Sequence, residues 1–550
     1  MLRDIFKRQI NSITIAAILV AFSSLASRFL GVVRDRILAG QFGAGTTLDI
    51  YYAAFRIPDL IFNMIVLGAL SAGFIPIFTS VIKNMNGDDK AGPAGPAKAA
   101  NHEAWGLANN ILNFLLLGIG SLSLLGIVFA PALTRLITPG FNPEQQALTA
   151  NLTRIMFLSP LFLGISGIVG GVLQSFKRFL VYSLAPIFYN LGIIAGALFF
   201  VNWWGISGLA WGVVLGALLH MGIQIPTVYH LGFRFRLGIS WRDKNTGQIG
   251  RMMIPRTLSL AISQINLVVV TALASNLASG SLAVFNFANN LQSFPIGIFG
   301  ISFAIAAFPS LAASAFDKEK LIDNFSSTFR QILFFIIPST VLIIALRAQI
   351  IRVILGTGNF NWHDTILTMD TLGFFALSLF AQATIPLLVR VFYARHNSTT
   401  PFLIGIVTVA VNTILAMYMA PRFGITGIAL AYSIDNILNF LLLWAWLYFT
   451  VGHLDISNIL VSTLKLTISA LAAGGAAQVT KVLVWPFIDM TKFSGVFIQL
   501  AAAGSVGLIV YLGFCYLLGS EELAGFWSSW QNKRAGQRYK VDDQGEARGV

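Results

Sequence analysis

The sequence predicts an all-α polytopic membrane protein with about fourteen transmembrane helices, and three observations predict it. Apolar residues make up 56% of the 550 residues and charged residues only 11%, whereas a soluble domain carries about 25% charge to cover its water-facing surface. The mean hydropathy is +0.76. The apolar residues also cluster in runs of roughly 20, each long enough to cross about 30 Å of hydrocarbon.

Windows of about 19 residues locate the predicted spans in order along the chain. We expect every span to be a helix, because a backbone exposed to lipid must satisfy its own hydrogen bonds, and the alternating pattern typical of a membrane barrel does not occur. The predicted spans are residues 12–39, 50–80, 105–129, 152–176, 182–201, 205–229, 252–277, 282–314, 325–347, 370–393, 400–420, 424–450, 457–485 and 493–518.

The first apolar run has an alternative interpretation as a secretory signal peptide. It follows Lys7 and Arg8, and Ser24–Ala26 resembles a cleavage site. The run is long for a signal peptide, however, and the helical pattern continues through Arg28. We therefore expect a membrane helix.

The positions of Lys and Arg predict the orientation of the spans. If the N-terminus lies inside, the inner segments hold most of the basic residues between spans, as the positive-inside rule requires. Both termini are then cytoplasmic, because an even number of spans returns the chain to its starting side. We also expect a flexible cytoplasmic loop at Asn84–Glu103, since its Gly-Pro-Ala composition cannot bury a core. The outer connections hold only Arg135, Arg347, Arg352, Arg422, Lys481 and Lys492.

Short motifs recur in the same order in the two halves of the chain. Gly205–Ala210 opens the sixth predicted span and the similar Gly424–Ala429 opens the twelfth; Gly45–Leu48 before the second span echoes Gly280–Leu282 before the eighth. A repeat of six helices gives both halves the same orientation, as in transporters whose site lies between two lobes. The predicted domains are an N-terminal lobe (1–230), a cytoplasmic inter-lobe linker (231–251), a C-terminal lobe (252–450), two additional helices (451–520) and a polar cytoplasmic tail (521–550).

The first two predicted helices of each half carry stripes of polar residues, whereas most other spans are apolar all round. An ionisable group at membrane depth costs at least about 2.5–3.5 kcal/mol, so it usually faces a cavity or a partner. Residues three and four apart share a helix face, and these stripes therefore predict the walls of a polar cavity. The candidate cavity residues are Arg28, Arg34, Asp35, Asp49, Arg56, Arg256, Asn266 and Asn290.

Structural roles remain as alternatives for these residues. The amide side chains could join helices through hydrogen bonds, and Arg34, Asp35 and Asp49 could lie at the outer interface, where long side chains snorkel. For Arg28 and Arg256 the alternative is a salt bridge to a nearby aspartate. Asp435, an isolated carboxylate in the twelfth predicted span, could be a coupling-ion or proton site, or could pack with Asn436 and Asn439.

The sequence argues against several other classes of protein. The net charge of +14 is spread over short loops and forms no basic groove, so we expect no nucleic-acid partner. The six histidines are scattered without metal-ligand spacing, no phosphate-binding Walker A loop occurs, and Cys515 is the only cysteine. We therefore expect a transporter without a metal or cofactor, not an enzyme. Arginine in a cavity suits an anionic cargo, because its guanidinium pairs bidentately with phosphates and carboxylates.

Ten short blocks of the chain resemble the MurJ (MviN) family of lipid II flippases, which belongs to the multidrug/oligosaccharidyl-lipid/polysaccharide (MOP) exporter superfamily. The first block, Ser27–Asp35, is the most specific, and the resemblance spans nearly the whole chain. Fourteen helices also match that family. The blocks are Ser27–Asp35, Phe42–Gly45, Phe55–Leu60, Gly68–Pro76, Pro139–Phe141, Pro255–Arg256, Gln264–Asn266, Phe294–Pro295, Leu355–Gly358 and Phe392–Arg395.

The resemblance implies a function. Such proteins move undecaprenyl-pyrophosphate-linked peptidoglycan precursor from the inner to the outer leaflet of the bacterial cytoplasmic membrane, by alternating access through a cationic central cavity. The family's cavity arginines match Arg28 and Arg34, and its acidic positions match Asp35 and Asp49. We accordingly interpret the eight candidate cavity residues as substrate-binding.

The chain also departs from the family pattern. Phe62–Asn63 stands where familiar members have two arginines, and Asn289–Asn290 stands where they have Asp-Arg. Arg256 is a candidate to supply the lost charge.

Two alternative functions stay open at this point. One is a flippase for another polyprenyl-pyrophosphate-linked glycan, and the other is an ion-coupled exporter of small molecules, which would need an acidic cavity. For either flippase we expect a monomer that works beside cell-wall synthesis enzymes. Its energy source would be the membrane potential or a monovalent ion.

Overall fold

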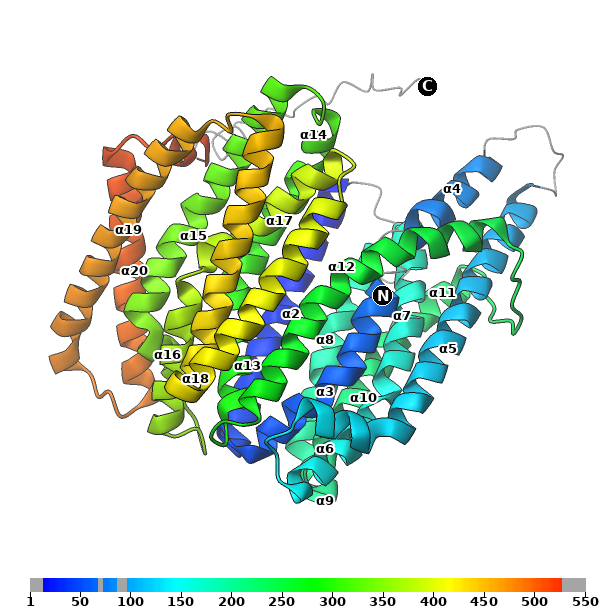
Figure 1. Cartoon of the computed structure of the whole chain (residues 1–550), viewed down its shortest axis with the longest axis horizontal. Coiled ribbons are helices and arrows are strands. Elements are labelled where there is room, and N and C mark those ends of the chain that lie inside the picture. Colours follow the sequence, from blue (N-terminus) through cyan, green and yellow to red (C-terminus); the bar gives the residue numbers. More distant parts are fainter. Residues whose placement is uncertain (1–12, 68–72, 87–95, 527–550) are drawn as a thin grey trace, which may run out of the picture. The chain divides into compact units, whose positions relative to one another are not determined.

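The computed structural model describes residues 13–67, 73–86 and 96–526, which form helices and their connections without a β-strand (Figure 1). Within these ranges only the backbone is described for residues 13–18, 67, 83–86, 96–102, 255–256, 258–260 and 263. Of the predicted tail (521–550), residues 521–526 are helical and the rest lies outside the described residues.

Every predicted span corresponds to a helix or to consecutive helices of the structure. The elements are α2 (Ile13–Phe42), α3 (Thr46–Phe62), η1 (Asn63–Leu67), α4 (Ile75–Asn86), α5 (Pro96–Ile137), α6 (Pro143–Met156), α7 (Leu158–Ser175), α8 (Phe179–Ala195), η3 (Gly196–Phe200), α9 (Val201–Trp204), α10 (Ser207–Gly222), α11 (Ile225–His230), α12 (Lys244–Ala274), α13 (Ser281–Pro295), η4 (Ile296–Ile301), α14 (Ser302–Ala313), α15 (Lys318–Ile354), α16 (Trp362–Ala376), α17 (Leu379–Ala394), α18 (Thr399–Val451), α19 (Ile456–Val484), η5 (Trp485–Phe487) and α20 (Phe493–Leu517).

The lengths and apolar character of these helices confirm an all-α polytopic membrane protein. In the described part of the chain nine helices are long and apolar enough to cross a membrane, or ten if α16 and α17 form one broken span. Helix α18 runs over 53 residues and bends at Gly424, so it contains two of the predicted spans. The predicted spans outside this group are those of α2, α3 and α12, three of the four helices that carry polar stripes. The ten spans, the second span within α18 and these three helices are consistent with the predicted fourteen spans.

Two connections are shorter than the sequence predicts. Helix α4 continues to Asn86 and α5 begins at Pro96, so the loop expected at Asn84–Glu103 is largely helical at both ends. Helix α12 begins at Lys244 rather than near residue 252, because Asp243 caps it by accepting a hydrogen bond from Thr246 N at 2.9 Å. A side chain that satisfies a free N–H group at a helix end favours starting the helix there.

The repeated Gly-Ile motifs adopt the same backbone conformation in both halves. Gly205 has φ 55° and ψ −143°, and Gly424 has φ 61° and ψ −142°. This region of φ favours glycine, since a Cβ atom would be strained there. The local geometry therefore agrees with the sequence repeat, while the division of the chain into two six-helix lobes stays a prediction.

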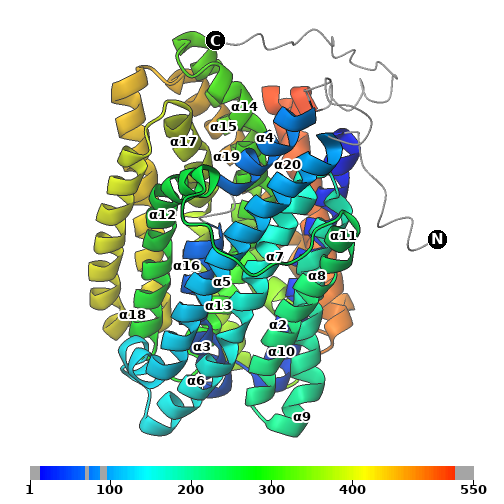
Figure 2. The ribbon, with the colours of Figure 1, turned by 90° about the vertical axis from the view of Figure 1, so that its right-hand side faces the viewer.

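The chain forms two compact units, and the first comprises Met1–Phe294, Ile351–Phe375 and Phe402–Asn436. Within it α8 and α10 approach so closely that a Cβ on Gly192 would meet the backbone of Gly216. Small residues permit such contacts between membrane helices. The connection between α11 and α12 crosses α5 on the surface of this unit (Figure 2).

The second unit comprises Pro295–Ile350, Ala376–Pro401 and Ile437–Val550. Helices α19 and α20 lie side by side in it (Figure 1) and pack on α15 through Leu346, Ala477 and Ala503. A buried amide pair also joins this group, since Gln349 Nε2 donates to Gln499 Oε1 at 2.8 Å.

Candidate functional site

Helix α2 carries a buried carboxylate that binds two different partners. Both Nε and Nη2 of Arg34 donate to Asp35 Oδ1, at 3.0 and 2.9 Å. Asn290 of α13 donates from Nδ2 to the other oxygen, Oδ2, at 2.9 Å. Asp35 is 5% exposed, and a buried charge is tolerated only when it is paired and hydrogen-bonded. The carboxylate therefore holds α2 and α13 together.

A third helix completes the contacts of Arg34. Its Nη1 donates to Asn190 Oδ1 of α8 at 3.1 Å, and Asn190 in turn donates to the backbone oxygens of Ser27 and Pro186. The sequence analysis missed Asn190 because it assigned the polar stripes to the first two helices of each half. Its signal was present, since Asn190 is the one amide or charged residue in the predicted span 182–201.

A cavity of about 140 Å³ opens beside this cluster. It has room for a few water molecules, each of about 30 Å³, or for one small anionic group. The lining brings together four of the predicted site residues, with apolar side chains around them. The polar lining residues are Arg28, Arg34, Asp35, Asn290 and Ser293; the others are Gly31, Val32, Phe287, Leu291, Phe294, Ile354 and Leu355.

The charge of this lining is not balanced. Two arginines, Arg28 and Arg34, face one carboxylate, Asp35, which leaves a net charge of one positive unit. Arg34 is occupied by its hydrogen bonds, whereas no acceptor among the described residues binds the half-buried Arg28. The cavity therefore presents a guanidinium that is free to bind an anion.

Arg56 lies on α3 and joins two other helices. Its Nε donates to Thr271 Oγ1 of α12 and its Nη2 donates to Asn286 Oδ1 of α13, both at 2.8 Å. Both acceptors are neutral, so they satisfy its hydrogen-bonding groups without cancelling its charge. Arg56 does not line the 140 Å³ cavity.

Asp49 binds the start of α13. Its Oδ2 accepts a hydrogen bond from Gly280 N at 2.6 Å and its Oδ1 accepts one from Ala283 N at 2.8 Å. Carboxylates at this position satisfy free N–H groups and interact favourably with the helix dipole. Asp49 is buried and does not line the cavity, so in this conformation both carboxylate oxygens are used within the chain.

Asn266 on α12 and Asp435 on α18 lie outside the lining of this cavity. Asn412 Nδ2 donates to Asn266 Oδ1 at 2.5 Å. Asn412 Oδ1 and Asp435 Oδ1 are buried and accept no hydrogen bond from the described residues. Asn436, one of the packing partners expected for Asp435, instead donates to Tyr432 O at 2.8 Å. Two unsatisfied buried oxygens are costly unless a water or a cation binds them.

The side chain of Arg256 lies outside the described residues. Of the eight predicted substrate-binding residues, the structure brings Arg28, Arg34, Asp35 and Asn290 together in one cavity. Asp49, Arg56 and Asn266 make contacts elsewhere in the same compact unit.

We expect Asp49→Ala to lower the free energy of unfolding by about 1–2 kcal/mol, because the start of α13 loses its cap. The measurement is the thermal denaturation midpoint of the purified full-length protein in detergent. Asp323→Ala removes an exposed carboxylate and serves as the control, with an unchanged midpoint. A wild-type midpoint for Asp49→Ala would contradict the capping role and leave substrate binding as the better interpretation of Asp49.

Comparison with known sequences identifies the family. Residues 38–497 match the family model for the lipid II flippase MurJ. A probable lipid II flippase MurJ of Rhizobium tropici is 32% identical over 450 residues, which cover 80% of this chain and 81% of that protein. A probable lipid II flippase MurJ of Vibrio cholerae is 28% identical over 531 residues, with 92% and 96% covered.

Solved structures show the same fold. A lipid II flippase MurJ in an inward closed conformation has a TM-score of 0.72 and 24% identity, and the match covers 94% of this chain and 99% of that one. An inward-facing multidrug resistance MATE family transporter of the MOP superfamily has a TM-score of 0.64 and 16% identity, with 78% and 95% covered. The chain is therefore a polytopic transporter, and it belongs to the lipid II flippase MurJ family.

Proposed function

We propose that this protein moves lipid II from the inner to the outer leaflet of the cytoplasmic membrane by alternating access. The observation that carries the proposal is the cavity between α2 and α13, where Arg28 and Arg34 outnumber the single carboxylate of Asp35. Lipid II carries a pyrophosphate, and guanidinium groups bind phosphate oxygens through paired, charge-assisted hydrogen bonds.

Arg28 is the proposed first contact of the pyrophosphate, because its guanidinium has no acceptor among the described residues. Arg34 and Asn290 would join it by exchanging their bonds to Asp35 for bonds to phosphate. Fixed donors of this kind replace the hydration that the phosphate loses on leaving water. At about 140 Å³ the cavity accepts a phosphate but not a disaccharide-peptide, so transport requires it to widen.

The contacts that would break when the cavity widens join the first and second halves of the chain at one end. They involve the connections after α2, α12 and α15, and all lie within one compact unit. Thr46 Oγ1 lies 2.6 Å from Ser279 Oγ, Ala44 N donates to Asp364 Oδ2 at 3.1 Å, and Asn359 Nδ2 donates to Gln41 O at 2.6 Å.

These bonds are individually weak. Each hydrogen bond contributes about 0.5–1.5 kcal/mol net, so a ligand that binds one state better than the other can shift the balance between a closed and an open end. By the positive-inside rule these connections face outward and both termini are cytoplasmic. A membrane potential that is positive outside favours outward movement of the anionic headgroup, by about 2.3 kcal/mol per charge per 100 mV.

We further propose that Asp435 couples transport to a monovalent cation. Its Oδ1 is buried without a hydrogen-bond donor among the described residues. Oxygen ligands and one negative charge suit a proton or a small hard cation. The proposal extends the role suggested by the sequence for this isolated carboxylate.

We expect wild-type protein to complement a conditional lipid II flippase knockout, and Arg28→Ala or Arg34→Ala to fail at equal expression. Losing one charge-assisted contact costs about 1.5–3 kcal/mol, equivalent to about tenfold to hundredfold weaker binding. Growth and lipid II flipping in vesicles are the readouts. Arg422→Ala is the matched control, because Arg422 is exposed and bonds only within its own helix, to Tyr418 O.

Complementation by both cavity variants would refute the cationic binding site while keeping the function. Failure of well-expressed wild type, with lipid II unmoved in vesicles, would favour a different polyprenyl-linked cargo.

A disulfide between the halves tests alternating access. We expect the double variant Thr46→Cys, Ser279→Cys to form a cross-link under oxidation and to stop flipping, because the two oxygens it replaces are 2.6 Å apart and the end could no longer open. Reduction should restore activity. Each single variant is the control, and the one native cysteine, Cys515, is buried. Undiminished flipping by fully cross-linked protein would exclude opening at this end.

Asp435→Asn tests ion coupling. In vesicles with an imposed Na⁺ or H⁺ gradient, we expect the variant to lose the dependence of flipping on that gradient, because the amide removes the charge that binds the ion. Asp323→Asn should behave as wild type. If Asp435→Asn keeps the full gradient dependence, the cation site is elsewhere.

A further inference from the structure

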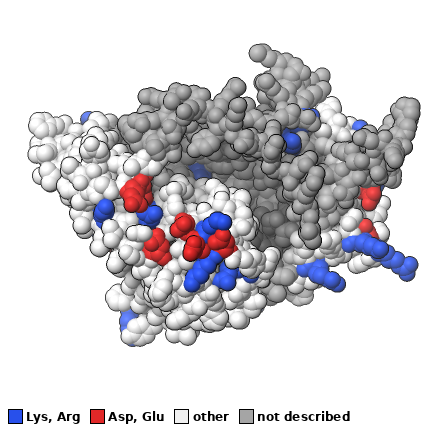
Figure 3. Space-filling model, turned by 90° about the horizontal axis from the view of Figure 1, so that it is seen from above, with Lys and Arg blue, Asp and Glu red and all other residues white. Residues whose placement is uncertain are grey.

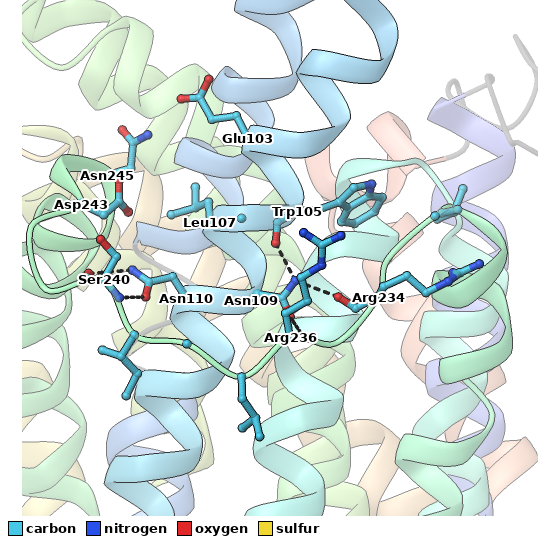
Figure 4. Close-up of a pocket in the computed structure, with 16 residues that line it drawn as sticks. Glu103, Trp105, Leu107, Asn109, Asn110, Arg234, Arg236, Ser240, Asp243 and Asn245 are labelled. Carbon is cyan, nitrogen blue, oxygen red and sulfur yellow. Dashed lines mark hydrogen bonds between the residues drawn. The ribbon is translucent and has the colours of Figure 1, made fainter.

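The connection between α11 and α12, residues 231–243, lies across α5 as a strap, and asparagines hold its backbone. Asn109, Asn110 and Asn113 project from α5 and are each less than 10% exposed. Their amides bind backbone groups of the strap, and Figure 4 shows this for Asn109 and Asn110. The bonds are Asn109 Nδ2 to Arg234 O (3.0 Å), Arg236 N to Asn109 Oδ1 (2.8 Å), Asn110 Nδ2 to Ser240 O (3.0 Å), Ser240 N to Asn110 Oδ1 (2.7 Å), and Asn113 Nδ2 to Arg236 O (2.8 Å) and Gly238 O (2.9 Å).

This bonding pattern shows that the strap is extended. Every bound backbone group belongs to an even-numbered residue between 234 and 240, and in an extended strand alternate residues turn their backbone groups to the same side. Side chains then alternate between the two remaining faces. Phe235, Leu237 and Ile239 share one face of the strap, and Arg234 and Arg236 share the opposite face.

The apolar face is not covered by the protein. Phe235 is 50% exposed and Leu237 is 88% exposed. Trp241, next along the strap, is 76% exposed and touches α5 only edge-on, with its ring 4.8 Å from that of Phe114. Exposed apolar side chains with a tryptophan are typical of the boundary between lipid and water.

The basic side chains of the strap are available for a ligand. Residues 231–245 contain four basic residues and one acidic residue, and that acidic residue, Asp243, is used to cap α12. Arg236 and Arg242 are exposed, and their guanidinium groups bind none of the described residues. Seen from above, Lys and Arg side chains project at the edge of the molecule where Figure 1 places α5 and α11, with acidic ones beside them (Figure 3).

A cavity of about 790 Å³ lies between the strap and α5. Its wall contains two basic residues, Arg234 and Arg236, two acidic residues, Glu103 and Asp243, and the apolar side chains of Leu237 and Ile239. Figure 4 shows the two arginines projecting from the strap beside Trp105. Arg234 already donates to Tyr229 O and Phe233 O, and Asp243 caps α12. The donor that the wall offers to an anion is therefore Arg236, beside the apolar side chains of Leu237 and Ile239.

We propose that the strap is a binding site for an anionic phospholipid, separate from the transport cavity on α2 and α13. The phosphodiester would bind Arg236, which lines the cavity, Arg242 would add positive charge near the headgroup, and an acyl chain would lie along Phe235, Leu237 and Trp241. The excess of positive charge selects an anionic over a zwitterionic headgroup, and the uncovered apolar face selects a lipid over a soluble phosphate. The bound lipid would hold the strap against α5 and the start of α12, which α5 already binds through Asn110 Nδ2 and Thr246 Oγ1 at 2.8 Å.

Native mass spectrometry of the purified full-length protein tests this site without any transport assay. Phosphatidylglycerol and phosphatidylcholine with identical acyl chains are titrated separately. We expect phosphatidylglycerol to bind in preference and to raise the thermal denaturation midpoint. Glycerol 3-phosphate, the soluble part of the same headgroup, should not compete at equal concentration.

Substitutions test the basic part and the apolar part of the site separately. We expect Arg236→Gln with Arg242→Gln to weaken phosphatidylglycerol binding about ten- to thirtyfold, because each basic residue near an anionic headgroup contributes about fivefold. Arg236→Lys with Arg242→Lys should retain most of it. Leu237→Asn should weaken the binding of both lipids. The matched control is Lys318→Gln with Lys320→Gln, which removes two exposed charges at the start of α15.

Three results would overturn the proposal. They are equal binding of the two lipids by wild type, unchanged phosphatidylglycerol binding by the Arg-to-Gln pair, and displacement of the lipid by glycerol 3-phosphate, which would indicate a site for a soluble anion. Because lipid binding is read directly, failure here leaves the proposed flippase function unaffected.

Discussion

The cost of leaving a polar group unpaired at membrane depth is the constraint on which this structure depends. Arg34 and Asp35 can be buried among helices because they pair with each other, and because Asn190 and Asn290 supply the remaining partners. The pairing draws three helices, α2, α8 and α13, to one point. Arg28 is the exception, since it lines the same cavity without an acceptor among the described residues. A phosphate would bind most favourably to this unpaired cation, because the neighbouring polar groups already satisfy one another.

The same constraint explains how the helices of the two halves meet at one end. Asp49, Arg56 and Asp364 each bind a backbone group or a neutral side chain of another segment. Such bonds satisfy the buried groups in this conformation. In the proposed alternating-access cycle they would be exchanged for bonds to water, and no ion pair would have to be broken because their partners are neutral. A transporter needs this property, since its two states must differ by only a few kcal/mol to be shifted by a ligand.

In the strap across α5 the polar groups of a loop backbone are paired as well. Three buried amides satisfy the strap's backbone, so its side chains are not needed to hold it in place and are free to project. An extended segment then separates apolar from basic side chains by simple alternation. Its apolar face suits the hydrocarbon side of a membrane interface and its basic face suits the headgroup side. The chemistry of this surface therefore differs from that of the transport cavity.

The sequence by itself determined the class of protein, the order of its helices and the polar stripes of α2, α3, α12 and α13, because membrane insertion depends on local composition. Arg28, Arg34 and Asp35 were predictable together, since one family block contains all three, whereas Asn290 departs from the family pattern and was marked only by the polar stripe of its helix. Tertiary structure alone decided that Asn190 binds Arg34, that Asp49 caps α13, and that Asn109, Asn110 and Asn113 bind a strap more than 120 residues away in the chain. An isolated asparagine or aspartate shows that a partner is required. Which partner meets it depends on how the helices pack, and no pattern local to the sequence contains that information.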